Sequence, residues 1–242
     1  HMNEHGITLK HGKHKGRIIR PSRNYGKGNR PASIFHTHYT NAVYSDDHGK
    51  TWQTSEPFSE FGTGEAALVE LSDGTLYYNT RRHWAPEGKS PFRRWGAWSS
   101  DGGHTWKGTV MHDALPDGPQ SSKYGCMGGL VRLPVKGEDI LIYSNCDSPI
   151  KADEKAVGIS GKGRNNGTVW ASFDGGKTWP IKRLITKESF AYSSLDTGRP
   201  GTKTDGTIYL HFESGKGSKL ARFNLAWVLE GEKTNNGVIP AK

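Results

Sequence analysis

Five side chains are placed in the sequence so that the ends of neighbouring strands would bring them together. Glu65 precedes an apolar strand and Arg81 ends the strand that follows it, so a hairpin would place the two close to each other. Tyr192 holds the same place before a later strand, Glu213 ends that strand's partner, and Arg164 leads into a third strand. A glutamate beside a tyrosine can accept the phenolic proton, and the planar fork of arginine suits a carboxylate. The set indicates nucleophilic chemistry on a ligand that carries an anionic group.

Each of these residues also has a structural interpretation. An isolated tyrosine before a strand is commonly a packed aromatic ring with a solvated hydroxyl group, which would suffice for Tyr192. Glu65 and Arg81 could form an ordinary surface ion pair, and Arg164, in the polar stretch GKGRNNG, could be a solvated charge on a turn. The functional interpretation therefore depends on all of them lying on one side of the fold.

The elements that would position these residues are marked by a repeated motif, SxDxGxTW. It occurs as SDDHGKTW at 45–52, SSDGGHTW at 99–106 and SFDGGKTW at 172–179. Serine and aspartate can accept hydrogen bonds from turn amides, glycine permits positive φ, and tryptophan can lie under the turn as an apolar plug. The acidic spacing of a calcium-binding EF-hand loop is absent from the motif. We therefore expect these boxes to stabilise turns and to take no part in chemistry.

The chain repeats a unit of strand, turn, strand, loop and strand. The units open near Gly6, Ala66, Gly129 and Ser193, at steps of 60, 63 and 64 residues. We expect an all-β fold, a β-propeller of small antiparallel sheets, in which a fourth strand of a unit begins at the box tryptophan. The expected units span residues 6–60, 61–120, 121–188 and 189–230. In such up-and-down sheets the five side chains above share one rim, and the boxes occupy the other.

Composition narrows the classes of partner. The 242 residues carry a formal charge of +9, which favours anionic partners, but the basic residues are scattered and do not favour nucleic acid. The sequence predicts neither a membrane-spanning segment nor a cofactor. Cys126 and Cys146 are too few for a disulfide framework, and whether they pair is left open. The histidines of the HTH stretch at 36–38 lack the further ligands of a metal site, and we expect no metal.

The sequence resembles the exo-α-sialidases, or neuraminidases, in which such boxes are known as Asp boxes or bacterial neuraminidase repeats. The resemblance runs from about Gly6 to Leu229. It is carried by the boxes together with GEAALVELSDGTLYYNTR, SNCDSP followed by GRNNGTVWASFDGGKTW, AYSSL and LARFNLAWVL. Asp boxes alone have low specificity because unrelated propellers contain them, whereas the ordered set is far more specific. The resemblance implies a retaining hydrolase that releases terminal sialic acid from glycoconjugates.

The resemblance also implies a role for each of the five side chains. Tyr192, in AYSSL, matches the nucleophile, and Glu65 matches its base. Arg81 and Arg164 match two of the three arginines that bind the sialic acid carboxylate, and Glu213 resembles an acidic residue that orients one of them. A neutral phenol suits this substrate because a carboxylate nucleophile would approach the carboxylate on the anomeric carbon against like charge.

One part of the family pattern is missing from this sequence. The resemblance implies six blades, with a first carboxylate-binding arginine in an RIP-like motif and an acid aspartate one blade later, and neither motif occurs among residues 1–242. We therefore expect residues 1–242 to be the C-terminal part of a sialidase propeller, with self-association or pairing with the missing blades. The family implies a secreted or periplasmic protein. A non-catalytic Asp-box propeller that binds glycan or protein remains an alternative. The sequence leaves open which sialic acid linkage is preferred and whether the sialic acid is released to water or transferred to another sugar.

Overall fold

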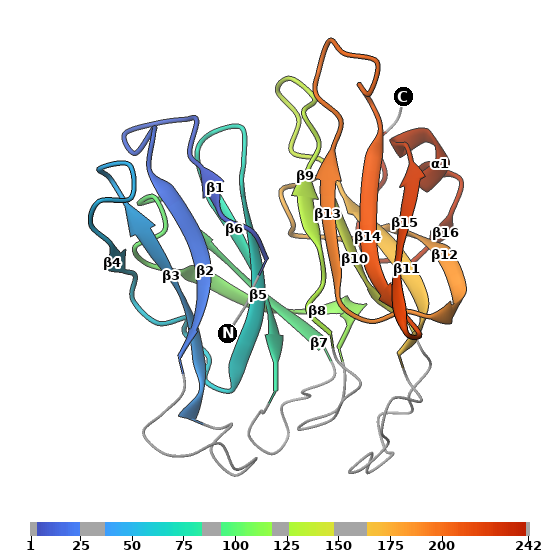
Figure 1. The fold of residues 1–242 in the computed structure, drawn as a ribbon, viewed down its shortest axis with the longest axis horizontal. Coiled ribbons are helices and arrows are strands. Elements are labelled where there is room, and N and C mark those ends of the chain that lie inside the picture. Colours follow the sequence, from blue (N-terminus) through green and yellow to red (C-terminus); the bar gives the residue numbers. More distant parts are fainter. Residues whose placement is uncertain (1–3, 25–36, 84–92, 118–125, 148–163, 241–242) are drawn as a thin grey trace.

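The computed structural model describes residues 4–24, 37–83, 93–117, 126–147 and 164–240, which form four antiparallel sheets. The first sheet has the order β1 (Ile7–Thr8), β2 (Ile18–Asn24), β3 (Tyr39–Ser45) and β4 (Gln53–Thr54). The second has the order β5 (Thr63–Glu70), β6 (Leu76–Arg82), β7 (Arg93–Ser99) and β8 (Lys107–Pro116). The predicted all-β propeller is confirmed, with four blades side by side (Figure 1).

The third sheet includes a strand from the end of the chain, which follows the fourth sheet in the sequence. The third combines β9 (Leu130–Arg132), β10 (Leu141–Cys146), β11 (Asn165–Ser172), β12 (Ile181–Ser189) and β16 (Glu232–Lys233). The fourth has only β13 (Ser193–Thr197), β14 (Ile208–Ser214) and β15 (Gly217–Phe223). After β15 the chain forms the short helix α1 (Leu225–Leu229), capped by the side chain of Asn224, and returns to pair β16 with β12.

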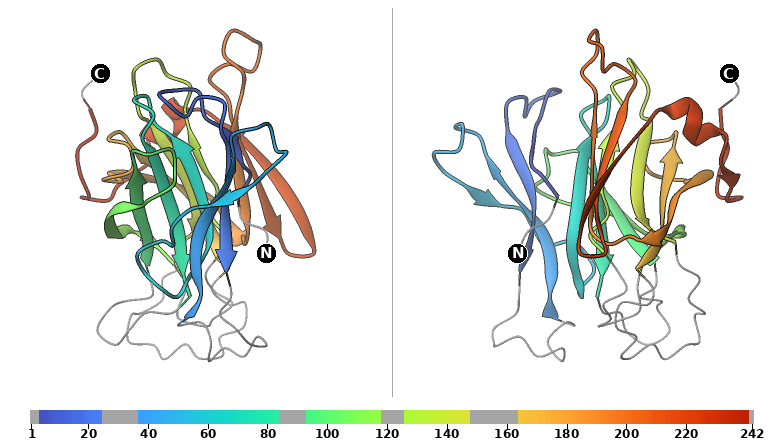
Figure 2. Two further views of the ribbon diagram at one scale, coloured as in Figure 1. Left: turned by 90° about the vertical axis from the view of Figure 1, so that its left-hand side faces the viewer. Right: turned by 45° about the vertical axis from the view of Figure 1, so that its right-hand side comes forward.

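Figure 2 shows the sheets arranged next to one another. The apolar core lies between them, because strand alternation turns one row of side chains toward each neighbouring sheet. One hydrophobic cluster joins the first and second sheets, another the second and third, and another the third and fourth. Among the described residues none of these clusters joins the fourth sheet to the first. Near the axis the backbone N–H of Glu4 donates to the carbonyl of Ala66 at 3.1 Å, and the hydroxyl of Ser194 donates to the Glu4 carboxylate.

The box turns form as the motif predicts. In the third box the Ser172 hydroxyl donates to Asp174 at 2.8 Å, and the backbone N–H of Gly176 donates to that hydroxyl at 2.9 Å. Asp174 also accepts from the backbone and the hydroxyl of Thr178, at 2.9 and 2.6 Å. Gly176 has φ of 90°, so a residue with a side chain would be strained there. The other two boxes repeat this pattern of bonds.

The prediction that each box tryptophan plugs its turn is wrong for the first box. Trp106 and Trp179 are 7% and 0% exposed, whereas Trp52 is 50% exposed. Trp106 packs in the cluster between the first and second sheets, and Trp179 in the cluster between the second and third. Each buried tryptophan thus lies against the preceding sheet, and the described chain contains no sheet before the first for Trp52 to pack against.

Candidate functional site

The site is centred on a contact between the second and fourth sheets. The hydroxyl of Tyr192, directly before β13, donates to Glu65 Oε1 of β5 at 2.5 Å. The pairing of β5 with β6 is irregular at Glu65. Thr63 pairs with Arg82 and Ala66 pairs with Thr80, so the two residues between them in β5 oppose a single residue of β6. Such a bulge re-aims a side chain and is common beside active sites. The expected contact of the phenol with the carboxylate is present in the structure.

Close packing requires glycine in this bulge. A methyl group at Gly64 would lie 2.6 Å from Nε2 of His83 and 2.9 Å from Nε of Arg23. Both neighbours are buried, and Arg23 donates to Nδ1 of His38 at 2.9 Å. Burial, followed by the charges of Arg81 and Arg23, holds the pKa of His83 well below its ordinary value, so this ring is neutral. Glycine therefore lets the bulge approach these side chains closely.

Glu65 and Arg81 form a buried ion pair. Arg81 donates to Glu65 Oε2 at 2.9 Å, and their side chains are 5% and 2% exposed. Burial by itself raises the pKa of Glu65, but the charge of Arg81 and the hydrogen bond from Tyr192 outweigh it, and the net shift is downward. The pKa of Tyr192 is raised, first by burial and then by the charge of Glu65. The proton therefore rests on the phenol, and the carboxylate is ionised and ready to accept it.

The second predicted arginine lies over the nucleophile candidate. Cζ of Arg164, directly before β11, is 5.2 Å from the centre of the Tyr192 ring. Together with Arg81 it lowers the pKa of Tyr192, opposing burial and Glu65. Two guanidinium groups from two sheets thus flank one phenol, which favours an anionic ligand at this place.

Glu213, at the end of β14, is exposed and lies beside the backbone of Tyr192. Its carboxylate accepts from the backbone N–H of Tyr192 at 3.4 Å, and its own backbone N–H donates to the Tyr192 carbonyl at 2.9 Å. These bonds fix the segment that carries the phenol. A contact between Glu213 and an arginine stays a prediction.

Comparisons with known proteins agree with this geometry. The family model described as BNR repeat-like domain matches residues 5–210. This chain belongs to the BNR repeat-like family. A sialidase of Micromonospora viridifaciens is 32% identical over 228 residues, which cover 92% of this chain and 30% of that protein. The predicted resemblance to sialidases is thereby confirmed.

Solved structures of sialidases share the propeller. A Hadza microbial sialidase aligns with a TM-score of 0.65 and 25% identity, over 92% of this chain and 37% of that one. The intramolecular trans-sialidase of Ruminococcus gnavus, solved with oseltamivir carboxylate, gives 0.64 and 23% identity, over 92% and 43%. At that identity the second likeness shows the fold alone. This BNR repeat-like chain spans less than half the length of each of these proteins.

Two buried residues beside the site of this BNR repeat-like domain were not among the predicted site residues. Arg94 lies in β7 and donates to Asn79 at 2.8 Å and to the Glu65 carbonyl at 3.4 Å. Asp117 follows β8, and its carboxylate lies 3.8 Å from Arg81 and 3.7 Å from Arg94. The available signal was a charged residue at an inward-facing position of the strand FRRWGAWS, where alternation calls for an apolar side chain.

The two cysteines lie side by side in the third blade. Their sulfur atoms are 3.6 Å apart, both residues are buried, and they do not form a disulfide bond in the structure. The Cys146 thiol also donates to the Phe190 carbonyl at 3.0 Å. The hydrogen bond to Cys126 and burial raise the pKa of Cys146 well above its ordinary value, so it is an unreactive thiol at neutral pH.

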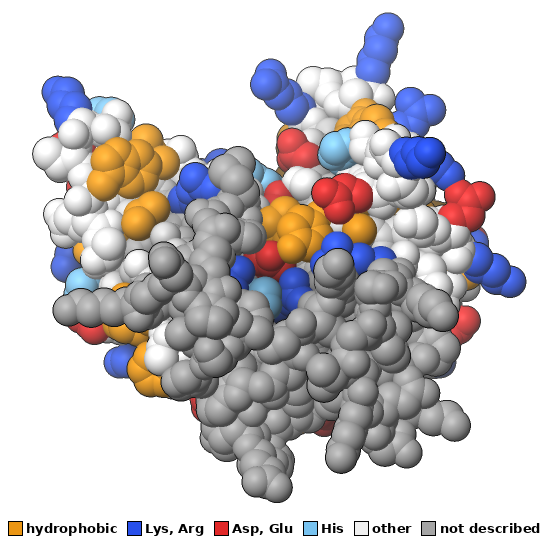
Figure 3. All heavy atoms as spheres, turned by 60° about the horizontal axis from the view of Figure 1, so that its bottom comes forward, with side chains coloured by type: hydrophobic (Ala, Val, Ile, Leu, Met, Phe, Trp, Pro, Cys, Tyr) orange, Lys and Arg blue, Asp and Glu red, His pale blue; other side chains and the backbone are white. Residues whose placement is uncertain are grey.

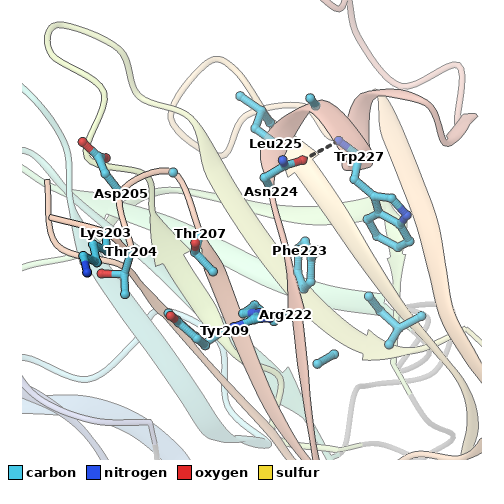
Figure 4. Close-up of a pocket in the computed structure, with 14 residues that line it drawn as sticks. Lys203, Thr204, Asp205, Thr207, Tyr209, Arg222, Phe223, Asn224, Leu225 and Trp227 are labelled. Carbon is cyan, nitrogen blue, oxygen red and sulfur yellow. Dashed lines mark hydrogen bonds between the residues drawn. The ribbon is translucent and has the colours of Figure 1, made fainter. Parts of the chain in front are cut away.

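The surface of the site rim is mixed in charge. Figure 3 shows this face, where basic, acidic and histidine side chains meet beside an apolar patch in a hollow. A cavity of about 950 Å³ lies elsewhere, between the fourth sheet and α1 (Figure 4). It is open, and Asn224 at its border is engaged in capping the helix. None of the five candidate site residues lines this cavity.

The described residues contain neither a metal-ligand cluster nor a helix that could cross a membrane. Within the five described ranges no group of three or more histidine, cysteine, aspartate or glutamate side chains is arranged to hold a metal ion. His36 of the HTH stretch lies outside those ranges. None of the helices in the described part of the chain has the length and apolar character to span a membrane.

Proposed function

We propose that this chain carries the nucleophile half of an exo-α-sialidase site, which releases terminal sialic acid from glycoconjugates with retention of configuration. The observation that supports this most directly is the 2.5 Å hydrogen bond from Tyr192 to a buried, ionised Glu65. Arg81 and Arg164 lie close enough to the phenol to bind a carboxylate attached to the carbon that it attacks.

In the first step the Tyr192 oxygen bonds to the anomeric carbon while its proton passes to Glu65. The bond from that carbon to the leaving oxygen breaks, and the leaving oxygen takes a proton from a general acid. The family resemblance assigns that acid to an aspartate, and a third carboxylate-binding group to an arginine, that residues 1–242 do not match. In the second step water bonds to the anomeric carbon and gives a proton to the general acid, which lost one in the first step. The bond from that carbon to the tyrosyl oxygen breaks, and Glu65 returns its proton to Tyr192. The two displacements together retain configuration.

The two arginines and Glu65 have different electrostatic roles in the proposed reaction. Arg81 already binds Glu65, so its guanidinium bridges the base and the substrate carboxylate, while Arg164 approaches from the other sheet. As the phenol loses its proton, the negative charge that develops on its oxygen faces both guanidinium groups, which stabilise it. We assign Glu213 to holding the Tyr192 backbone, with the orientation of an arginine as its further expected role.

The exposed side chain of Trp52 raises the question of what packs against the first sheet. We infer that a further sheet covers it in the complete protein, because the equivalent tryptophans of the second and third boxes are buried against a preceding sheet. Self-association through the same face is the alternative. A change in molecular mass in solution on adding the upstream segment as a separate chain would distinguish the two.

The test is hydrolysis of a fluorogenic sialoside by the full-length protein and by its Tyr192→Phe and Glu65→Ala variants. We expect each variant to lose turnover by about 10³-fold or more, since each removes a group that takes part in bond making. Unchanged turnover in both variants would end the catalytic assignment. Binding of sialylated glycan without any turnover by the wild type would instead support the non-catalytic propeller.

A further inference from the structure

A buried polar cluster adjoins Arg81 and the backbone of the base Glu65. The side chains of Arg94 and Asp117 are both 0% exposed, and the Asp117 carboxylate faces two guanidinium groups at 3.7 and 3.8 Å. It also accepts from the backbone N–H of Arg82 at 3.1 Å. These residues lie outside the five that sequence motifs assign to the site.

Stability alone is a poor reason for such a cluster. Removing charges from water is unfavourable, and well-packed apolar residues often stabilise a protein as much as a buried ion pair does. The charges balance, because Glu65 and Asp117 offset Arg81 and Arg94. A cluster of this kind serves best where fixed charges must hold a functional group in place.

The geometry shows which groups the cluster holds. Arg94 donates through Nε to Asn79 of β6, through one terminal nitrogen to the carbonyl of Cys126 at 3.2 Å, and through the other to the carbonyl of Glu65 at 3.4 Å. The carbonyl of Glu65 belongs to the bulge, where the regular strand pairing is interrupted. Arg94 thus joins the bulge to the next strand of its own sheet and to the entry of the third blade.

Asp117 acts on the other guanidinium group. Its Oδ1 faces Nε of Arg81, whose terminal nitrogen donates to Glu65. With Nε and one terminal nitrogen directed toward two carboxylates, the plane of the Arg81 guanidinium is fixed.

We propose that Asp117 is a positioning residue, which holds Arg81 and Arg94 so that the Arg81 guanidinium keeps its orientation and Glu65 stays directed at Tyr192. This inference rests on the proposed function, since it assigns Asp117 to the same site. It predicts that removing only the charge of Asp117 impairs substrate binding while the fold is retained.

The test compares Asp117→Asn with Asp139→Asn in the full-length protein. Asp139 is a matched control, because it also accepts from an arginine, Arg132, at 2.7 Å, but at the opposite rim. For Asp117→Asn we expect KM for a fluorogenic sialoside to rise by about tenfold or more, with a smaller effect on kcat, since a displaced binding group weakens substrate positioning. For Asp139→Asn we expect wild-type kinetics.

A second readout separates positioning from general damage. Without the Asp117 charge Glu65 lies in a more positive surrounding, so its pKa falls and the acid limb of kcat/KM moves to lower pH. A purely structural defect would lower activity at every pH without moving that limb. Asp117→Asn behaving like Asp139→Asn in both KM and pH profile would overturn the proposal.

Two further measurements keep the outcomes distinct. If the wild type shows no turnover, the proposed function fails, and the pKa of Glu65 measured by carbon-13 NMR in the wild type and in Asp117→Asn still tests the positioning. An unchanged Glu65 pKa then overturns it. If Asp117→Asn does not fold, Asn79→Ala removes the acceptor of Arg94 Nε, together with a hydrogen bond to the Tyr77 hydroxyl, and we expect a smaller rise in KM. An unchanged KM in that variant would also count against the proposal.

Discussion

The first box turn, at 45–52, ends in a tryptophan that is 50% exposed, whereas the tryptophan that ends the third box, at 172–179, is fully buried. The hydrogen bonds of the two turns are nearly the same, since serine donates to aspartate at 2.7 Å in one and 2.8 Å in the other. The difference lies in the neighbours. Trp179 meets the rings of Tyr77 and Tyr143 at 6.3 and 5.9 Å, and Trp98 of the second sheet donates to the carbonyl of Gly175 at 2.9 Å.

The comparison separates two contributions of one motif. The serine, aspartate, glycine and threonine close the turn through local bonds that form wherever the motif occurs. The tryptophan stabilises the fold only when another sheet is packed against it, because its contribution comes from apolar surface that is removed from water. One motif is therefore a local turn in the first blade and a joint between blades in the third.

The largest expected effect is on the tryptophans themselves. Trp179→Ala should lower the free energy of unfolding by about 3–5 kcal/mol, because it empties a site in a close-packed core. Trp52→Ala should cost less than about 1 kcal/mol, as for an exposed position. Urea denaturation of both variants checks this. Equal losses would show that the two tryptophans are packed alike.

The aspartates of the boxes should respond alike to acid. The hydrogen bonds from Thr51 and Ser45 lower the pKa of Asp47 from 3.8 to about 2. For Asp101, burial raises the pKa, but the bonds from Thr105 outweigh it, and the pKa again falls from 3.8 to about 2. A lowered folded-state pKa adds stability above about pH 4, and that stability is lost as the pH falls toward 2.

We therefore expect Asp47→Asn and Asp101→Asn each to reduce the loss of stability between about pH 4 and pH 2, and to do so to a similar degree. Denaturation midpoints measured across that range are the readout. A flattened acid limb in one variant only would mean that the exposed box and the buried box differ in their turns as well as in their packing.

The smallest expected effect concerns the residue before the box glycine. His48 has φ of 60°, at the position where the other boxes have Gly102 and Gly175, with φ of 70° and 69°. The left-handed conformation costs a residue with a side chain about 1 kcal/mol, so His48→Gly should stabilise the domain by about that amount. Gly49→Ala, at φ of 85°, is the opposite control and should destabilise it. Thermal unfolding of both variants is sufficient, and a destabilised His48→Gly would contradict the account.

Much of the fold followed from local pattern. The strands that carry Glu65, Arg81 and Tyr192 could be placed from alternation and from turn residues, and antiparallel connection put their ends on one rim. The bulge at Gly64 and Glu65 could not be placed, because a single extra residue leaves the alternation nearly unchanged. Arg94 and Asp117 were missed for a related reason: a charged residue in a strand is ordinarily solvated, and only the neighbouring sheets bury these two.

The sequence by itself determined the turns, the repeat and the residue types available for chemistry, because these depend on bonds and alternation within a few residues of each other. Only the tertiary structure decided that Tyr192 of one sheet reaches Glu65 of another, that Asp117 stands between two arginines, and that one box tryptophan of three lies exposed. Those contacts depend on how the sheets are arranged about the axis, and that arrangement is set by the packing of side chains far apart in the chain.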